Sequence, residues 1–171
     1  MRENFDKSLQ LLLKHEGGFV NHERDPGGMT NLGVTKKVYE EWLGYEVDKQ
    51  DMMKLTPEDV APIYLNNYWI KAGCDELPSG LDYVTFDWAV NSGVSRSSKG
   101  VQKCCGASPD GVIGPKTLEL VAGQDTKYMI EKFKEVRQSF YEGLNHFDTF
   151  GRGWTRRNDE ATEVALKMVE E

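Results

Sequence analysis

Five glycines crowd the stretch His15–Thr35, HEGGFVNHERDPGGMTNLGVT, and this stretch restricts the fold more than any other part of the chain. A glycine inside a helix costs roughly 1 kcal/mol relative to alanine, so the stretch does not fit a helix interior. It fits a tight loop or a β-hairpin, whose turns need backbone conformations that glycine adopts readily. We therefore predict a small β-hairpin near residues 18–34.

Two carboxyl residues, Glu16 and Asp25, lie on opposite sides of the first glycine turn. Phe5, Leu9 and Leu12 recur at helical spacing, and Glu16 continues that apolar face. A carboxyl on such a face is partly desolvated, which raises its pKa and keeps it protonated, as a general acid must be. Asp25 lies among polar residues and glycines and should stay ionised. Paired carboxyls of this kind suit glycosidic bond hydrolysis, whereas a helix end and an Asp-Pro-Gly turn are the structural alternative.

The same stretch resembles glycoside hydrolase family 108, a family of phage and bacterial lysozyme-like muramidases. The resemblance is carried by three runs: EGGFVN from Glu16, DPGG from Asp25 and TNLGVT from Thr30. The order Glu, Asp, Thr also resembles the catalytic trio of the T-even phage lysozymes. The resemblance implies that Glu16, Asp25 and Thr30 are the catalytic residues. Met29 stands where a proline is expected in this family, a departure that affects the turn rather than the chemistry.

What the resemblance implies is hydrolysis of the β-1,4 bond between N-acetylmuramic acid and N-acetylglucosamine in peptidoglycan. Three alternatives stay open: a lytic transglycosylase with 1,6-anhydro products, a peptidase, and a non-catalytic peptidoglycan-binding protein. The first residues do not form a signal peptide, and three cysteines, two of them adjacent, favour a reducing compartment. With the resemblance, these features predict a phage endolysin held in the cytoplasm of the infected bacterium. Such a protein reaches the cell wall through a separate membrane pore.

The formal net charge of −7 argues against general nucleic-acid binding, which needs a basic face. It also fits poorly with an anionic cell-wall substrate, unless Arg152, Arg156 and Arg157 form a local basic patch instead of a solvated helix start. No apolar run reaches the roughly 18 residues of a membrane span, so no stable membrane insertion is expected. The three histidines are scattered and match no zinc site, and we predict no metal, no cofactor and a monomer.

Helical patterns fill most of the remaining chain. The first predicted helix is capped by Asn4 and runs to about His15, and the glycines of Gly151–Trp154 should separate the last two helices. The other predicted helices follow Thr35 and Thr56, cover Leu81–Ser92 and Ser95–Cys105, begin at Pro115, and run from the cap Asp125 to about His146. The predicted fold is therefore mainly α, lysozyme-like and two-lobed, with a cleft for the glycan. We predict a catalytic part at residues 1–92 and a peptidoglycan-binding-like helical part at residues 93–171, packed together as one globule.

Five further residues are candidate substrate ligands. Asn31 belongs to the family-like motif. Asn91, on the apolar helix 81–92, would line the sugar cleft, or else satisfy nearby backbone groups. Tyr68 offers an aromatic ring for sugar stacking, although aromatic residues at helical spacing are more often core. Asp110 begins DGVIGPKTL, which resembles the core motif of peptidoglycan-binding modules, and Trp154 lies in a phrase similar to the C-terminal part of the family.

Overall fold

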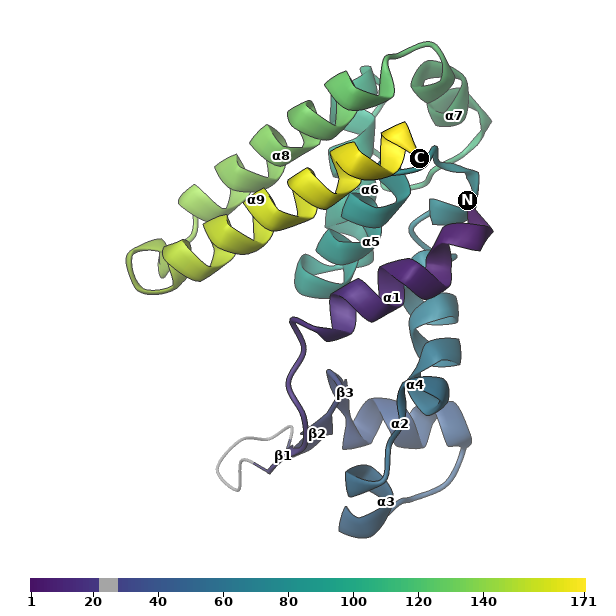
Figure 1. Cartoon of the computed structure of the whole chain (residues 1–171), viewed down its shortest axis with the longest axis vertical. Coiled ribbons are helices and arrows are strands. Elements are labelled where there is room, and N and C mark those ends of the chain that lie inside the picture. The colour runs from purple at the N-terminus through teal and green to yellow at the C-terminus, as the bar shows by residue number, and fades with distance from the viewer. Residues whose placement is uncertain (22–27) are drawn as a thin grey trace. The chain divides into compact units, whose positions relative to one another are not determined.

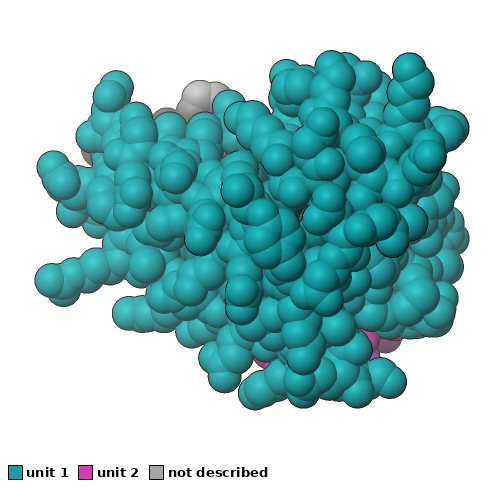
Figure 2. All heavy atoms as spheres, turned by 90° about the horizontal axis from the view of Figure 1, so that it is seen from above, with its two compact units in different colours: residues 1–5, 68–171 teal, residues 6–67 magenta. Residues whose placement is uncertain are grey.

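The computed structural model describes residues 1–21 and 28–171 (Figure 1). Its contacts divide the chain into two compact units, coloured separately in Figure 2. Unit 1 contains residues 1–5 and 68–171, and unit 2 contains residues 6–67. The described chain is mainly helical with a small antiparallel sheet, so the predicted mainly-α, lysozyme-like fold class is confirmed. The predicted functional boundary at residue 92 differs from these units and stays a prediction.

The sheet of unit 2 has the order β1-β2-β3, formed by Val20–Asn21, Met29–Asn31 and Val34–Thr35. Strands β2 and β3 are joined by the two residues Leu32 and Gly33, whose φ angles are 51° and 77°. Positive φ at both positions is the geometry of a type I′ turn, which matches the twist of a hairpin. The hairpin predicted near residues 18–34 is therefore present, extended by a third strand.

Two helices of unit 2 begin at polar caps that the sequence predicts. Thr35 accepts a hydrogen bond from the Val38 amide at 3.2 Å, and Thr56 forms a capping box with Asp59. These bonds satisfy amides that would otherwise lack partners at a helix start. The helices are α1 (Phe5–Leu13, whose first residue belongs to unit 1), α2 (Lys36–Leu43), α3 (Lys49–Met53), α4 (Pro57–Tyr64) and a π-helical turn, η2 (Leu65–Trp69), that leads into unit 1.

Unit 1 is built around α5, which contacts α6, α8 and α9. Nine of the twelve residues of α5 are buried, as expected for a helix that is apolar on several sides. Helices α8 and α9 run side by side in opposite directions (Figure 1). The elements of unit 1 are η1 (Arg2–Asn4), η3 (Cys74–Glu76), α5 (Leu81–Ser92), α6 (Val94–Cys105), α7 (Pro115–Ala122), α8 (Thr126–Glu142) and α9 (Phe147–Glu170).

Aromatic packing surrounds α5. Phe5, Trp69 and Phe86 form three edge-to-face pairs with ring centroids 5.3–5.9 Å apart. On α6, a Cβ at Gly100 would lie only 2.7 Å from the ring of Trp88. Glycine at this position therefore lets α6 approach α5 closely.

Several predicted helix boundaries are wrong, among them one at the start of the chain and one near its end. Asn4 does not cap the first helix, because its amide donates to Ser79 and to the buried Asp82 at 2.9 and 2.8 Å. The glycines at 151–154 do not break a helix: α9 passes through them, with Gly151 packed against the ring of Phe147. Packing of the buried face of α9 outweighs the low helix propensity of two glycines. Helix α8 also ends earlier than predicted, at Glu142.

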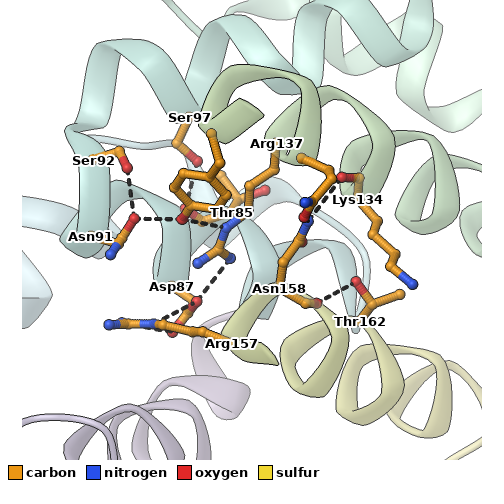
Figure 3. A network of polar contacts seen from close by, with 12 residues as sticks. Thr85, Asp87, Asn91, Ser92, Ser97, Lys134, Arg137, Arg157, Asn158 and Thr162 are labelled. Carbon is orange, nitrogen blue, oxygen red and sulfur yellow. Dashed lines mark hydrogen bonds and ion pairs between the residues drawn. The ribbon is translucent and has the colours of Figure 1, made fainter. Parts of the chain in front are cut away.

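Asp87 is a fully buried carboxylate at the centre of unit 1 (Figure 3). Arg137 of α8 approaches Asp87 Oδ2 to 2.8 Å, and Arg157 of α9 lies 3.0 Å from Oδ1. Burial by itself raises the pKa of Asp87, but attraction to Arg137 and Arg157 outweighs it and lowers the pKa below its ordinary value. The charged carboxylate therefore ties α5 to both α8 and α9.

Replacing Arg137 by methionine should destabilise unit 1 by about 3 kcal/mol or more, because it leaves a buried carboxylate with only one partner. Urea unfolding at pH 7 measures this. Since the pKa of Asp87 is lower in the folded state than in the unfolded state, the stabilisation is complete at neutral pH. It is lost as the pH falls through the folded pKa, so the difference from wild type should shrink below about pH 4.

The matched control is Lys134→Met, also on α8, whose ion pair with Asp159 is solvent-exposed. That variant should change the free energy of unfolding by less than about 1 kcal/mol. Equal stability of the two variants would show that the Asp87 ion pair does not stabilise unit 1.

Candidate active site

Glu16 lies in the loop between α1 and β1, where it is half-buried. The prediction that it continues the apolar face of the first helix is wrong, because α1 ends at Leu13. The His15 amide turns back to the Leu12 carbonyl at 2.9 Å, and two glycines follow Glu16. The backbone thus leaves the helix before Glu16, and the position of its carboxyl depends on the loop.

The carboxyl of Glu16 lies directly against the backbone of the β2–β3 turn. A Cβ added to Gly33 would stand 2.9 Å from Glu16 Oε2 and 3.0 Å from its carboxyl carbon. The same Cβ would also clash with the hydroxyl of Tyr64. Glycine is therefore required at position 33 for two reasons. Its backbone has a positive φ, and Glu16 and Tyr64 occupy the space that a side chain would need.

Hydrogen bonds fix this turn from both sides. The Tyr64 hydroxyl, from the end of α4, donates to the Leu32 carbonyl at 2.8 Å. The Leu32 amide donates to the Gly17 carbonyl at 3.1 Å, next to Glu16 in the chain. The site is thus built within unit 2 from the Glu16 loop, the turn and α4.

Thr30 and Asn31 occupy the central strand of the sheet. Asn31 is buried and donates to the Met52 carbonyl at 2.8 Å, so its amide attaches the hairpin to α3. Thr30 pairs with Val20 on one side and Thr35 on the other. Because neighbouring strand residues point to opposite faces, Thr30 presents its side chain on the sheet face away from α3. Its catalytic role, and the substrate contact of Asn31, stay predictions.

Asp25, the second predicted carboxylate, lies outside the described residues. The described chain places Glu16 beside the turn that follows Thr30 and Asn31, which are two residues of the predicted site.

Asn91, at the end of α5 in unit 1, belongs to the polar network that begins at Asp87 (Figure 3). Arg137 Nε donates to the Tyr141 hydroxyl at 2.9 Å, which in turn donates to Asn91 Oδ1 at 2.5 Å. The Ser92 hydroxyl donates to the same oxygen at 2.6 Å. With Oδ1 occupied by two donors, a substrate contact of Asn91 would have to use its amide nitrogen.

Three other predicted ligands also lie in unit 1. Tyr68 is half-buried in the π-helical turn η2. Trp154 is half-buried and stacks on Tyr141 with centroids 5.4 Å apart. Asp110 accepts hydrogen bonds from Gln102 and from the Val112 amide, and these bonds lower its pKa. These contacts give Trp154 and Asp110 structural roles, while their substrate contacts stay predictions.

Arg157 does not contribute to the predicted basic patch on α9, because it is bound to Asp87 and its side chain is only 16% exposed. Arg152 and Arg156 are exposed. In the part of the chain that the structure describes, no group of three or more His, Cys, Asp or Glu residues could hold a metal ion. Within the same residues, no helix is long and apolar enough to cross a membrane.

Two site contributions could not be recognised in the sequence. Tyr64 is buried, as expected for an apolar residue at helical spacing, but its hydroxyl also reaches a turn 32 residues earlier in the chain. Gly33 is one of the five glycines that predict the hairpin, but its contact with Glu16 is tertiary and leaves no pattern in the sequence. The pairing of Leu32 with Gly33 between two strands was the one available signal of a type I′ turn.

The described chain is mainly helical with a small sheet, as in the lysozyme-like fold class, and its Glu16 carboxyl lies against a glycine turn. The model of the glycosyl hydrolase 108 family matches residues 9–93, which include Glu16, the turn and Tyr64. The chain belongs to this family. It is also similar to the solved structure of SagA from Brucella abortus, with a TM-score of 0.88 and 38% identity over 100% of this chain and 98% of that one. No curated protein gives a significant sequence match.

Replacing Gly33 by alanine should abolish most of the hydrolytic activity on peptidoglycan, because the new Cβ displaces the Glu16 carboxyl. Clearing of a peptidoglycan suspension measures activity, and urea unfolding measures stability. Gly44→Ala is the matched control, since Gly44 has a φ of 85° but no atom within 4 Å of an added Cβ. Backbone strain should cost both variants roughly 1 kcal/mol, and Gly33→Ala should lose further stability because Tyr64 and Glu16 must move. Only Gly33→Ala should lose activity. Full activity of Gly33→Ala would contradict this placement of Glu16.

Proposed function

We propose that the chain is a muramidase, which hydrolyses the β-1,4 bond between N-acetylmuramic acid and N-acetylglucosamine in peptidoglycan. The observation that carries the proposal is the Glu16 carboxyl held against the Leu32-Gly33 turn, inside the segment that matches the family model. The remaining support is the resemblance of the Glu16, Asp25 and Thr30 motif to lysozyme-like enzymes.

Glu16 serves as the general acid in this proposal. Its carboxyl proton passes to the glycosidic oxygen as the bond to the anomeric carbon breaks. Asp25 and Thr30 hold a water molecule on the opposite face of the sugar. The water oxygen bonds to the anomeric carbon and a water proton passes to Asp25, so the two carboxyls have exchanged protonation states. Solvent restores both before the next cycle.

The turn supports this role of Glu16. A general acid has to keep its proton aimed at one oxygen, and a loop glutamate followed by two glycines would not do so unaided. The missing side chain at Gly33 lets the carboxyl rest on the backbone. The bonds of Leu32 to Gly17 and Tyr64 hold that backbone in place.

Two other reactions on peptidoglycan, lytic transglycosylation and peptide hydrolysis, differ from glycan hydrolysis in their products and in the groups they require. A lytic transglycosylase would use Glu16 alone and form a 1,6-anhydro product, which has one water less in its mass. A peptidase would need a Cys-His pair or a metal site, and Cys74, Cys104 and Cys105 are all buried. Burial also raises the pKa of Cys104 to about 12 and that of Cys74 well above its ordinary value. A non-catalytic peptidoglycan-binding protein would show no turnover at all.

The biological setting follows from the family resemblance and is part of the proposal. We propose a phage endolysin that accumulates in the host cytoplasm as a monomer and reaches the wall through a separately made membrane pore. Its helical part from residue 93 onward would bind peptidoglycan.

Replacing Glu16 by glutamine should lower the rate of peptidoglycan clearing by at least about 10²-fold, because the general acid is lost. The fold should be unchanged, since glutamine has nearly the same shape. Glu46→Gln, an exposed substitution in the same unit, is the control and should keep full activity. More than a tenth of wild-type activity in Glu16→Gln would refute the assignment.

The first product should have the α configuration, because a water held by Asp25 and Thr30 attacks the face opposite the leaving group. Inverting enzymes of this kind keep their carboxyls roughly 6.5–9.5 Å apart, against about 5–5.5 Å in retaining enzymes. The anomeric proton signal in the first minutes of hydrolysis distinguishes the outcomes. An early β product would make Asp25 a nucleophile instead.

A further inference from the structure

Unit 1 contains a cavity of about 770 Å³ between the end of α5, α6 and α8. We call it the α6–α8 groove. Its aromatic lining comes from Trp88 and Phe140, and its charged lining from Arg96, Lys99, Lys103, Lys132 and Glu135. The volume lies in the range of typical small-molecule sites. None of these residues belongs to the site around Glu16.

The groove is basic in a chain that is acidic. It has four cationic side chains and one carboxylate, whereas the whole chain has 21 Lys and Arg against 28 Asp and Glu. Arg96, Lys99 and Lys103 follow each other at spacings of three and four residues, so they share one face of α6. All three are exposed. The concentration of positive charge therefore faces the groove and solvent.

The groove lysines are also unpaired. Elsewhere in unit 1, Lys127 and Lys134 form ion pairs with Glu170 and Asp159 at 2.8 and 3.0 Å. In the described part of the chain, no carboxylate lies within ion-pair distance of Lys99, Lys103 or Lys132. Their charges are available to a ligand without the loss of an existing contact.

The aromatic wall of the groove is held in place. The Arg96 guanidinium lies 4.2 Å from the centre of the Phe140 ring and donates to the Ser92 carbonyl at 3.0 Å. Phe140 also packs edge-to-face on Trp88, with centroids 5.8 Å apart. A ligand thus meets one cation fixed on an aromatic surface and three lysines that make no ion pair with the residues that the structure describes.

We propose that the α6–α8 groove binds the peptide stems of peptidoglycan through their carboxylates, an inference that rests on the proposed function. The glycan itself offers mainly neutral hydroxyl and acetamide groups, while the stems carry carboxylates and the amine of a diamino acid. The cations match the carboxylates. Glu135, the single acid in the groove, matches the amine and would repel a polymer of phosphates.

Binding is measured separately from catalysis, so every protein that is compared carries the Glu16→Gln substitution. Calorimetry compares soluble peptidoglycan fragments that carry intact stems with the same glycan after the stems are removed and the exposed lactyl carboxylates are amidated. Lys99→Gln with Lys103→Gln removes two groove charges. Lys71→Gln with Lys116→Gln removes two exposed charges elsewhere in unit 1 and leaves the same net charge.

The groove variant should bind stem-bearing fragments about three- to tenfold more weakly than the control variant, and stem-free glycan equally well. Glu135→Gln should weaken binding of stems with a free amine but not of stems whose amine is acetylated. The wild-type preference for intact stems should decline as salt rises. Equal binding by the groove and control variants would overturn the proposal, as would a wild type that prefers short-chain polyphosphate to intact stems.

Failure of the muramidase proposal can be distinguished from failure of the groove proposal by measuring hydrolysis. Restoring Glu16 in the groove variant should leave the hydrolysis of stem-free glycan unchanged, because the groove lysines take no part in catalysis. A chain that binds stems through the groove but never cleaves the glycan would refute the muramidase proposal alone. A chain that cleaves the glycan without groove-dependent binding would refute the groove proposal alone.

Discussion

The buried carboxylate of Asp87 is the interaction on which unit 1 depends. A charge without water is costly, and two arginines from different helices compensate for it. Arg137 comes from α8 and Arg157 from α9, so both ion pairs form only when both helices are docked on α5. An apolar core would tolerate sliding or rotation of these helices, whereas a buried ion pair specifies one arrangement. The same arrangement orders Tyr141 and Asn91, which continue the network toward the end of α5.

Unit 2 places its functional carboxyl by a different means. Glu16 is not on a rigid helix, and its loop contains two glycines. Order comes from outside the loop, where the Leu32 carbonyl and amide each make a hydrogen bond and Gly33 leaves room for the carboxyl. The proposed general acid and the turn that supports it are therefore fixed by backbone geometry more than by side-chain packing.

The parts of the fold that follow from local rules were predictable from the sequence. Thr35 and Thr56 cap helices as expected, because capping involves residues only three apart. Local rules failed where tertiary contacts determine the structure. The segment Gly151–Trp154 has weak helix propensity but lies inside α9, and the sequence contains no signal that pairs Asp87 with Arg137, fifty residues away. The same holds for the candidate site. Its residues can be recognised as a motif in the sequence, but the contact that positions Glu16 cannot.

The Leu32-Gly33 turn also bears on how this enzyme could evolve. Leucine in the left-handed conformation costs roughly 1 kcal/mol, and type I′ turns strongly favour Asn-Gly. Natural proteins are seldom at their stability optimum, and here the shortfall lies next to Glu16. A selection for heat tolerance should therefore replace Leu32 early. Variants that resist this change would reveal that the leucine side chain, and not only the backbone of the turn, is under selection.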